Sequence, residues 1–148
     1  GPAGIDYFIF HRHAKVSKLP PFAVGRPGWD NWMIFRARQL RYRVIDATPS
    51  IQIVHQNHDY RHIPKGNGKS YMGPEADRNF DLADRQRTNF SMADATHQLV
   101  DGQLVELNDE AHRRRARSVR GDLWPWMRPA IAAGATAKRV MRRAGLLS

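Results

Sequence analysis

The chain has 148 residues, a formal net charge of +10, a hydrophobic fraction of 41% and no cysteine. This length suits a single domain, and the lack of cysteine excludes disulfides, thiolate-ligated zinc and thiol catalysis. No apolar run reaches the roughly 18 residues of a transmembrane helix, so we expect a cytoplasmic protein, or one held peripherally at the inner face of a membrane. The chain begins Gly-Pro-Ala-Gly rather than with Met, which we interpret as a processed chain or a fragment.

The positive charge is concentrated in the last quarter of the chain. Residues 1–110 hold 14 Lys/Arg and 13 Asp/Glu, whereas residues 111–148 hold 10 Lys/Arg and one acid, Asp122. A domain that reads nucleic acid usually carries its basic excess on the folded part, so we expect no specific nucleic-acid partner. The sequence therefore predicts a near-neutral domain over residues 1–110 and a basic, tryptophan-containing helical tail over residues 111–148.

The N-terminal part predicts a strand, a loop and a helix. Residues 6–10, DYFIF, are aromatic and β-branched, which indicates a short buried strand. The prolines and glycines of residues 20–28 exclude regular structure there. Apolar residues then recur with a helical period from about Trp29 to about Leu40. Asp30 stands at the start of this helix, where a carboxylate accepts free N–H groups and meets the positive end of the helix dipole.

Two strands and a further helix are expected next. The runs Arg43–Ala47 and Ile51–His55 predict strands, joined by a turn at residues 48–50, TPS. The polar cluster after His55 would then follow a strand end, where α/β folds commonly place functional residues. Gly73–Ala83 predicts a helix with Pro74 in its first turn.

The C-terminal part predicts a hairpin and two helices. Residues 99–107 surround Asp101-Gly102, a dipeptide typical of a hairpin turn. Residues 110–120 predict a helix that is polar nearly all round. The alanine-rich residues 130–144 are helical by propensity, although Gly134 weakens the helix.

Trp29-Asp30-Asn31-Trp32 is the first candidate site. A carboxylate beside two indole rings can act as a general base toward a sugar hydroxyl while the rings stack on the sugar. The structural alternative is that Asp30 only caps the helix and the tryptophans belong to the core. The residues alone leave both interpretations open.

The second candidate site is the segment from His55 to His62, with His58 and Asp59 inside it. Imidazole and carboxylate groups suit a divalent metal. The segment follows a predicted strand and precedes Pro64, so the four-residue spacing of His58 and His62 does not indicate a helical zinc motif. A hydrogen-bonded structural cluster is the alternative.

Arg26 and the basic tail are two further candidates. Arg26 lies between glycines and could meet a phosphate, or it could be a solvent-exposed arginine, because no glycine-rich phosphate loop surrounds it. The tail combines arginines with Trp124 and Trp126, a composition typical of an interfacial membrane anchor. Disorder and nucleic-acid binding are the alternatives for the tail.

Five segments, in order along the chain, resemble a family of bacterial glycosyltransferase-like proteins with the GT-A, or nucleotide-diphosphosugar transferase, fold. They are GIDYFIF (4–10), PPFAVGRPGWDNWMI (20–34), VIDATPSIQIVHQNHDY (44–60), GPEADRN (73–79) and DATHQL (94–99). The resemblance covers residues 4–107 and corresponds only to the C-terminal half of the family's domain. It implies an α/β fold with the mixed sheet of that half, without the half that binds the nucleotide.

The resemblance also implies roles for single residues. Asp30 would be the base that deprotonates the acceptor hydroxyl, and His55, with His58 and Asp59 as second candidates, would bind the metal. A sugar pocket would be formed by residues around that base, namely Trp29, Asn31 and Trp32, with Arg26 nearby. The intact enzyme would use a nucleotide-sugar donor, a sugar acceptor and Mn²⁺ or Mg²⁺.

Two functional hypotheses follow. In the first, the chain is the acceptor-side half of a glycosyltransferase that makes a bacterial glycan and is inactive without its nucleotide-binding half, supplied by another segment or chain. In the second, the chain is a non-catalytic binding or assembly module that docks to an anionic membrane or another polyanion through residues 111–148.

Overall fold

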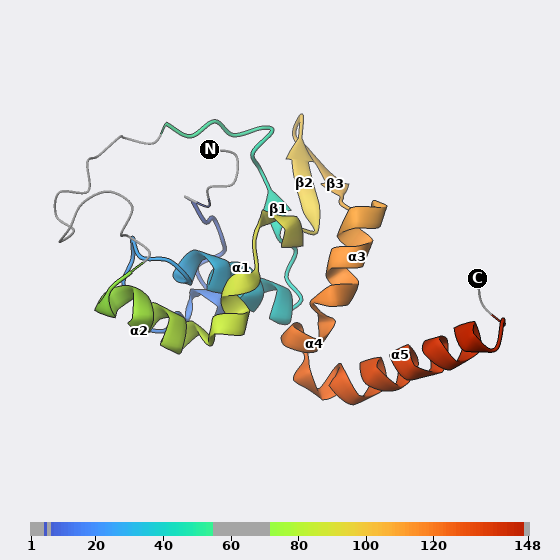
Figure 1. Cartoon of the computed structure of the whole chain (residues 1–148). Coiled ribbons are helices and arrows are strands. Elements are labelled where there is room, and N and C mark those ends of the chain that lie inside the picture. Colours follow the sequence, from blue (N-terminus) through green and yellow to red (C-terminus); the bar gives the residue numbers. More distant parts are fainter. Residues whose placement is uncertain (1–4, 6, 55–71, 147–148) are drawn as a thin grey trace.

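The computed structural model describes residues 5, 7–54 and 72–146. The described part is mixed α/β, with helices packed beside a small sheet (Figure 1). Its α-helices and strands are α1 (Trp29–Gln39), β1 (Ile45–Asp46), α2 (Pro74–Ala83), β2 (His97–Val100), β3 (Gln103–Glu106), α3 (Glu110–Ser118), α4 (Arg120–Leu123) and α5 (Arg128–Arg143). The short 3₁₀ turns are η1 (Lys15–Ser17), η2 (Arg85–Asn89), η3 (Met92–Asp94) and η4 (Pro125–Met127).

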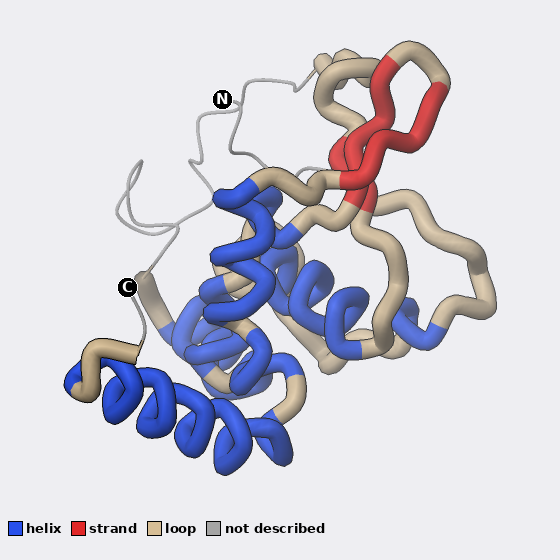
Figure 2. Tube along the Cα trace, turned by 90° about the vertical axis from the view of Figure 1, so that its right-hand side faces the viewer, coloured by secondary structure: helices blue, strands red, loops and turns tan. Residues whose placement is uncertain are grey.

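The sheet has the order β1-β2-β3, with β1 parallel to β2 and β2 antiparallel to β3. Ile45 pairs with His97, and His97 pairs in turn with Glu106. The turn residues Asp101 and Gly102 both have positive φ, which matches the twist that a two-residue hairpin requires. The predicted hairpin is therefore confirmed. Figure 2 shows the strands gathered at one end of the molecule, with most helices below them.

Helix α1 is the centre of the core. Four consecutive residues, Trp32 to Phe35, are buried, so this turn is enclosed on all sides rather than along one stripe. Phe35 packs edge-to-face on Phe90, with ring centroids 5.2 Å apart. The core cluster combines residues of α1, α2, the segment before η3, and the C-terminal helices, namely Trp32, Ile34, Phe35, Ala83, Phe90, Val119 and Leu123.

The helix predictions agree well with the structure. The helix predicted from Trp29 to Leu40 is α1, the one predicted at Gly73–Ala83 is α2, and the alanine-rich one is α5. Pro74 occupies the first turn of α2, where its missing N–H leaves no hydrogen bond unmade. The helix predicted at residues 110–120 divides into α3 and α4.

Two strand predictions are wrong over their described residues, and a third is shortened. Residues 7–10 and 51–54 form no strand, and Ile9 is 90% exposed. Phe8 instead packs as a single side chain against Trp29, with ring centroids 5.5 Å apart. Among the described residues, these runs have no neighbouring strand to satisfy their backbone groups, and an apolar run alone does not make a strand. The strand expected at Arg43–Ala47 is limited to Ile45–Asp46.

The core extends past residue 110. Val119 is 4% exposed and Leu123 is 1% exposed, and both contact the core cluster. The guanidinium of Arg41 also lies 5.4 Å from the ring of Trp124, a cation–π distance. The division of the chain into domain and tail stays a prediction, but α3 and α4 pack on the body, whereas α5 projects away from it (Figure 1).

Candidate functional site

The first candidate site lies at the N-terminus of α1. The backbone turns into the helix at Gly28, whose φ is +97°. Asp30 lies in the first turn, and its Oδ1 accepts the N–H of Asn31 at 2.9 Å. This is the predicted contact between a carboxylate and a free N–H at the helix start, although Gly28 and not Asp30 occupies the N-cap position.

The loop before α1 is fixed by one buried amide. Asn79 of α2 is fully buried, and its Oδ1 accepts the N–H of Ala23 at 2.8 Å. Its Nδ2 donates to the carbonyl oxygens of Ala23 and Pro27 at 3.0 and 3.2 Å. A buried amide with all these bonds holds a loop rigidly, because breaking any of them leaves a polar group without a partner. Asp30 is therefore presented by a firmly held backbone.

The side chains of Asn31 and the two tryptophans lie in different surroundings. Asn31 donates from Nδ2 to the carbonyl oxygen of Phe90 at 2.6 Å, which ties the helix start to the core. Trp32 is 7% exposed and packs edge-to-face on Phe22 at 5.5 Å. Trp29 is half-buried beside Phe8. The structure thus gives Trp32 the core position that was one of the two alternatives, while Trp29 and Asp30 remain accessible in part.

Arg26 is held by an ion pair. Its Nε lies 2.7 Å from Oε2 of Glu75, and its side chain is only 14% exposed. The interpretation of Arg26 as a solvent-exposed arginine is therefore wrong, because α2 supplies a carboxylate that sequence spacing did not reveal. A phosphate would have to compete with Glu75 for this guanidinium.

The predicted metal ligands His55, His58 and Asp59 lie outside the described residues. In residues 5, 7–54 and 72–146, no group of three or more His, Asp or Glu side chains is placed to hold a metal ion. The described part of the chain thus provides no ligand set against which Mn²⁺ or Mg²⁺ can be matched.

A second polar region lies between α1, η3, the base of the hairpin and α3. It surrounds a cavity of about 270 Å³. The lining side chains combine three arginines with two carboxylates and several small or polar groups: Arg38, Ala93, Asp94, Ala95, Thr96, Glu106, Leu107, Asn108, His112, Arg113, Arg115 and Ala116. Four of these residues, namely His112, Arg113, Arg115 and Ala116, belong to the basic segment that the sequence singled out, but the sequence did not predict a cavity there.

Asp94 is the buried centre of this region, with its side chain 1% exposed. Arg115 donates to both carboxylate oxygens, from Nε and from Nη2, each at 2.8 Å. Ser91 N–H donates to the same carboxylate at 3.0 Å, which completes a capping box at η3. The bonds to Asp94 raise the pKa of Arg115, so Arg115 stays charged at neutral pH.

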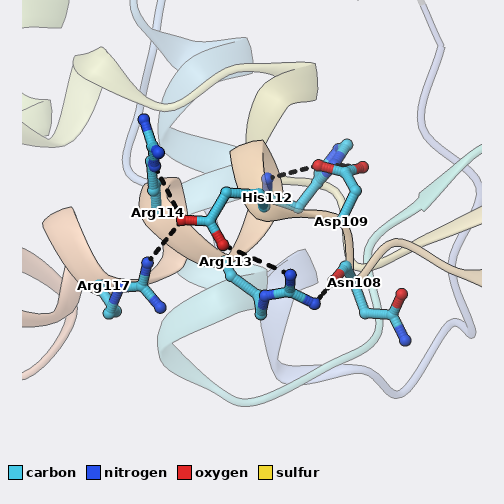
Figure 3. A network of polar contacts seen from close by, with 7 residues as sticks. Asn108, Asp109, His112, Arg113, Arg114 and Arg117 are labelled. Carbon is cyan, nitrogen blue, oxygen red and sulfur yellow. Dashed lines mark hydrogen bonds and ion pairs between the residues drawn. The ribbon is translucent and has the colours of Figure 1, made fainter.

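The outer face of α3 carries an arginine network (Figure 3). Asp109 caps the helix through the N–H of His112 at 3.0 Å, and bonds from His112 lower the pKa of Asp109. Glu110 accepts bonds from Arg113, Arg114 and Arg117, at 2.8–3.4 Å. This part of the basic segment is therefore an ordered network in which Glu110 pairs with Arg113 at i, i+3, with Arg114 at i, i+4 and with Arg117 at i, i+7.

Helix α5 is exposed along its whole length. At its base, Arg128 donates from Nε to the carbonyl oxygen of Gly121 at 3.0 Å, and its Nη2 lies 3.4 Å from Asp122. Trp126, just before the helix, is 73% exposed. Within residues 5, 7–54 and 72–146, no helix combines the length and the apolar character needed to cross a bilayer.

Sequence reasoning missed the cavity because its parts come from distant positions. Asp94 does have a local signal, since Ser91 precedes it by three residues in a capping-box spacing. Nothing in the sequence indicates that Arg115 would reach it, 21 positions away. No family model, no curated protein and no solved structure matches this chain.

Proposed function

We propose that residues 1–110 are the acceptor-side half of a GT-A glycosyltransferase, with Asp30 as the catalytic base. The observation that carries this proposal is the carboxylate of Asp30 at the start of α1. Its Oδ1 is fixed by the N–H of Asn31, and its side chain is only partly buried. The mixed α/β arrangement is compatible with half of such a domain.

The proposed reaction uses Asp30 as a proton acceptor. Its carboxylate takes the proton of an acceptor hydroxyl, and the hydroxyl oxygen forms a bond to the anomeric carbon of the donor sugar. The bond from that carbon to the diphosphate breaks, and the nucleoside diphosphate leaves with the electron pair. Trp29 offers a partly exposed ring for sugar stacking. Mn²⁺ or Mg²⁺ stays an expectation from the resemblance, because its candidate ligands lie outside the described residues.

The test is the substitution Asp30→Asn in the longest natural form of the protein that carries the nucleotide-binding half. We expect sugar transfer to fall by roughly 10²–10⁴-fold, as for the loss of a general base. Asp77 is the matched control, because it is also an aspartate in the first turn of a helix, and it is exposed. Asp77→Asn should transfer at the normal rate. A normal rate in Asp30→Asn, with both variants folded, removes Asp30 from the mechanism.

The exposure of α5 favours a second function, docking to an anionic membrane surface. By the helical period, five basic residues fall on one side and small or apolar residues on the other. The basic side carries Arg128, Lys138, Arg139, Arg142 and Arg143, and the apolar side carries Ala130, Ala133, Ala137, Val140 and Met141. Arg128 contacts α4, so the apolar side turns away from the body and is available to lipid.

Charge dominates this proposed interaction. Each Lys or Arg near an anionic leaflet contributes about 1 kcal/mol, so the four basic residues of α5 other than Arg128, which contacts α4, contribute about 4 kcal/mol. The apolar side is mostly alanine and adds less. We therefore expect binding to vesicles with phosphatidylserine that weakens as salt is raised, and little binding to neutral vesicles.

Co-sedimentation of residues 1–148 and 1–127 with the two vesicle types tests this function. The shorter chain keeps α3 and α4 and lacks only the helix in question. Equal binding by both chains, or equal binding to neutral and anionic vesicles, rules the docking proposal out. Preferential, steeply salt-dependent binding to duplex DNA would assign α5 to nucleic acid instead.

A further inference from the structure

The cavity beside Asp94 is lined by an arginine whose Nε has no hydrogen-bond partner in the described part of the chain. Arg38 projects into it from α1, two turns beyond Asp30. Its Nε is buried and finds no partner among the described residues. Burial lowers the pKa of Arg38, and the charge of Asp94 opposes that shift only in part. A guanidinium in this position is costly to bury unless an anion accompanies it.

The carboxylate of Asp94 is bonded mainly to Arg115. Arg115 engages its two oxygens from Nε and Nη2, and Ser91 N–H takes a further acceptor position. The cavity is thus lined by two arginines, Arg38 and Arg115, for one buried carboxylate. At its rim, exposed Glu106 adds a negative charge, while exposed Arg113 is already paired with Glu110 at 3.4 Å.

We propose that this cavity binds the carboxylate of a small organic acid, with Arg38 as the residue that pairs with it. The planar fork of an arginine matches a carboxylate in shape, and charge-assisted bonds of this kind are the strong ones. Arg38 and Arg115 exceed the buried carboxylate of Asp94 by one positive charge, which one carboxylate group neutralises. A phosphate dianion is disfavoured, because its second charge would face Asp94 and Glu106 without a cation.

The size of the cavity limits the ligand. Sites for drug-sized molecules have volumes of about 300–1,000 Å³, and this cavity of about 270 Å³ is smaller. Asn108 and Glu106 at the rim offer hydrogen-bond partners to hydroxyl groups. The ligand class is therefore a small hydroxylated monocarboxylate, of which a uronic acid is an example. This inference does not depend on the glycosyltransferase proposal, because it uses none of the residues around Asp30.

The experiment is a titration of the ¹⁵N-labelled chain with glucuronate, observed by NMR at the Arg38 Nε–H signal. We expect that signal to shift in a saturable way while the Nε–H signals of exposed Arg114 and Arg117 stay still. Glucose, which lacks the carboxylate, should produce no shift. Inorganic phosphate should bind more weakly than glucuronate at pH 7.5; tighter phosphate binding overturns the assignment to a carboxylate.

Variants separate a specific site from general charge attraction. Arg38→Gln should weaken glucuronate binding about 10- to 100-fold, the usual loss for a charge-assisted bond, whereas the matched Arg114→Gln should leave it unchanged. Arg114 is 74% exposed and bonds only to Glu110. Glu106→Gln, on the exposed edge strand, should tighten binding by removing a repelling charge. Equal affinity in Arg38→Gln, or weaker binding in a folded Glu106→Gln, overturns the proposal.

Discussion

At the scale of single residues, the contact between Asp94 and Arg115 has the largest structural consequence. The carboxylate is 1% exposed and the arginine side chain 33% exposed. Removing Arg115 therefore leaves a charge that water cannot reach, whereas removing Asp94 leaves a charge that water can reach in part. The same guanidinium also donates from Nη2 to the carbonyl oxygen of Asn89 at 2.6 Å. Arg115 thus anchors α3 to the segment that carries Phe90.

We expect Arg115→Gln to lower the free energy of unfolding by about 3–5 kcal/mol, the cost of breaking a buried ion pair from one side. Arg38 also interacts electrostatically with Asp94, so the loss should fall near the lower figure. The double variant Arg115→Gln/Asp94→Asn should recover part of it, because the uncompensated charge is gone. Urea unfolding measures all three proteins. If Arg115→Gln lowers the free energy of unfolding no more than the exposed Arg114→Gln does, the pair of Asp94 and Arg115 does not stabilise the fold.

At the scale of elements, turn residues and long helical periods predicted secondary structure correctly, whereas short apolar runs did not. Helices α1 and α2 were predicted within one residue at each end, since a Gly-containing loop precedes each and their patterns span three turns. Residues 7–10 and 51–54 have the composition of strands, but composition cannot supply the neighbouring strand that pairing requires. The hairpin succeeded because Asp101-Gly102 specifies its turn locally.

The candidate sites show the same difference between local contacts, which the sequence predicted, and long-range contacts, which it did not. Asp30 could be placed from sequence because its surroundings are local: a loop, a helix start and the next N–H. The roles of Trp32 and Arg26 depend on Phe22 and Glu75, which the sequence alone could not bring near them. The cavity depends wholly on such long-range contacts, since Arg38 and Asp94 are 56 positions apart in sequence.

Two glycines in different elements test the backbone requirements of α1 and α5. Gly28 precedes α1 with φ of +97°, and a Cβ there would lie 3.3 Å from Cγ2 of Thr88. We expect Gly28→Ala to lower the free energy of unfolding by more than about 1 kcal/mol, because alanine resists positive φ.

Gly134 lies inside α5 with open space around it. Gly134→Ala should raise helicity, with a gain of about 0.5–1 kcal/mol for α5.

Circular dichroism and thermal unfolding distinguish the two substitutions. Gly28→Ala should lower the midpoint of the main transition and disturb the position of Asp30. Gly134→Ala should increase the helical signal and leave the main transition unchanged, because no residue of α5 is buried. A lower midpoint in Gly134→Ala would mean that α5 packs on the body.

At the scale of the whole molecule, the basic C-terminal segment has two structurally different parts. Helices α3 and α4 belong to the body through Arg115, Val119 and Leu123. Helix α5 contacts the body near its base, through Arg128 and Ile131 close to Gly121. The uneven charge visible in the sequence thus does not mark where the fold ends, because arginines in α3 serve both as surface charge and as anchors.

Truncation at two positions gives the last prediction. A chain ending at residue 127 should unfold at the same temperature as the whole chain, whereas one ending at residue 109 should not fold. The shorter chain loses the burial of Val119 and Leu123, at about 1.5–3 kcal/mol each, and the partner of Asp94 at about 3–5 kcal/mol. Together these losses of roughly 6–11 kcal/mol are comparable with the total stability of a small domain, about 5–15 kcal/mol.

Thermal unfolding followed by near-ultraviolet circular dichroism measures this prediction, since Trp29 and Trp32 report packing in both truncated chains. A cooperative transition in residues 1–109 would contradict the assignment of α3 and α4 to the body. The chain of residues 1–127 also retains every arginine of α3 and α4 while removing all five basic residues of α5. Its loss of vesicle binding would therefore locate the membrane contact in α5, because the fold and the remaining basic surface are unchanged.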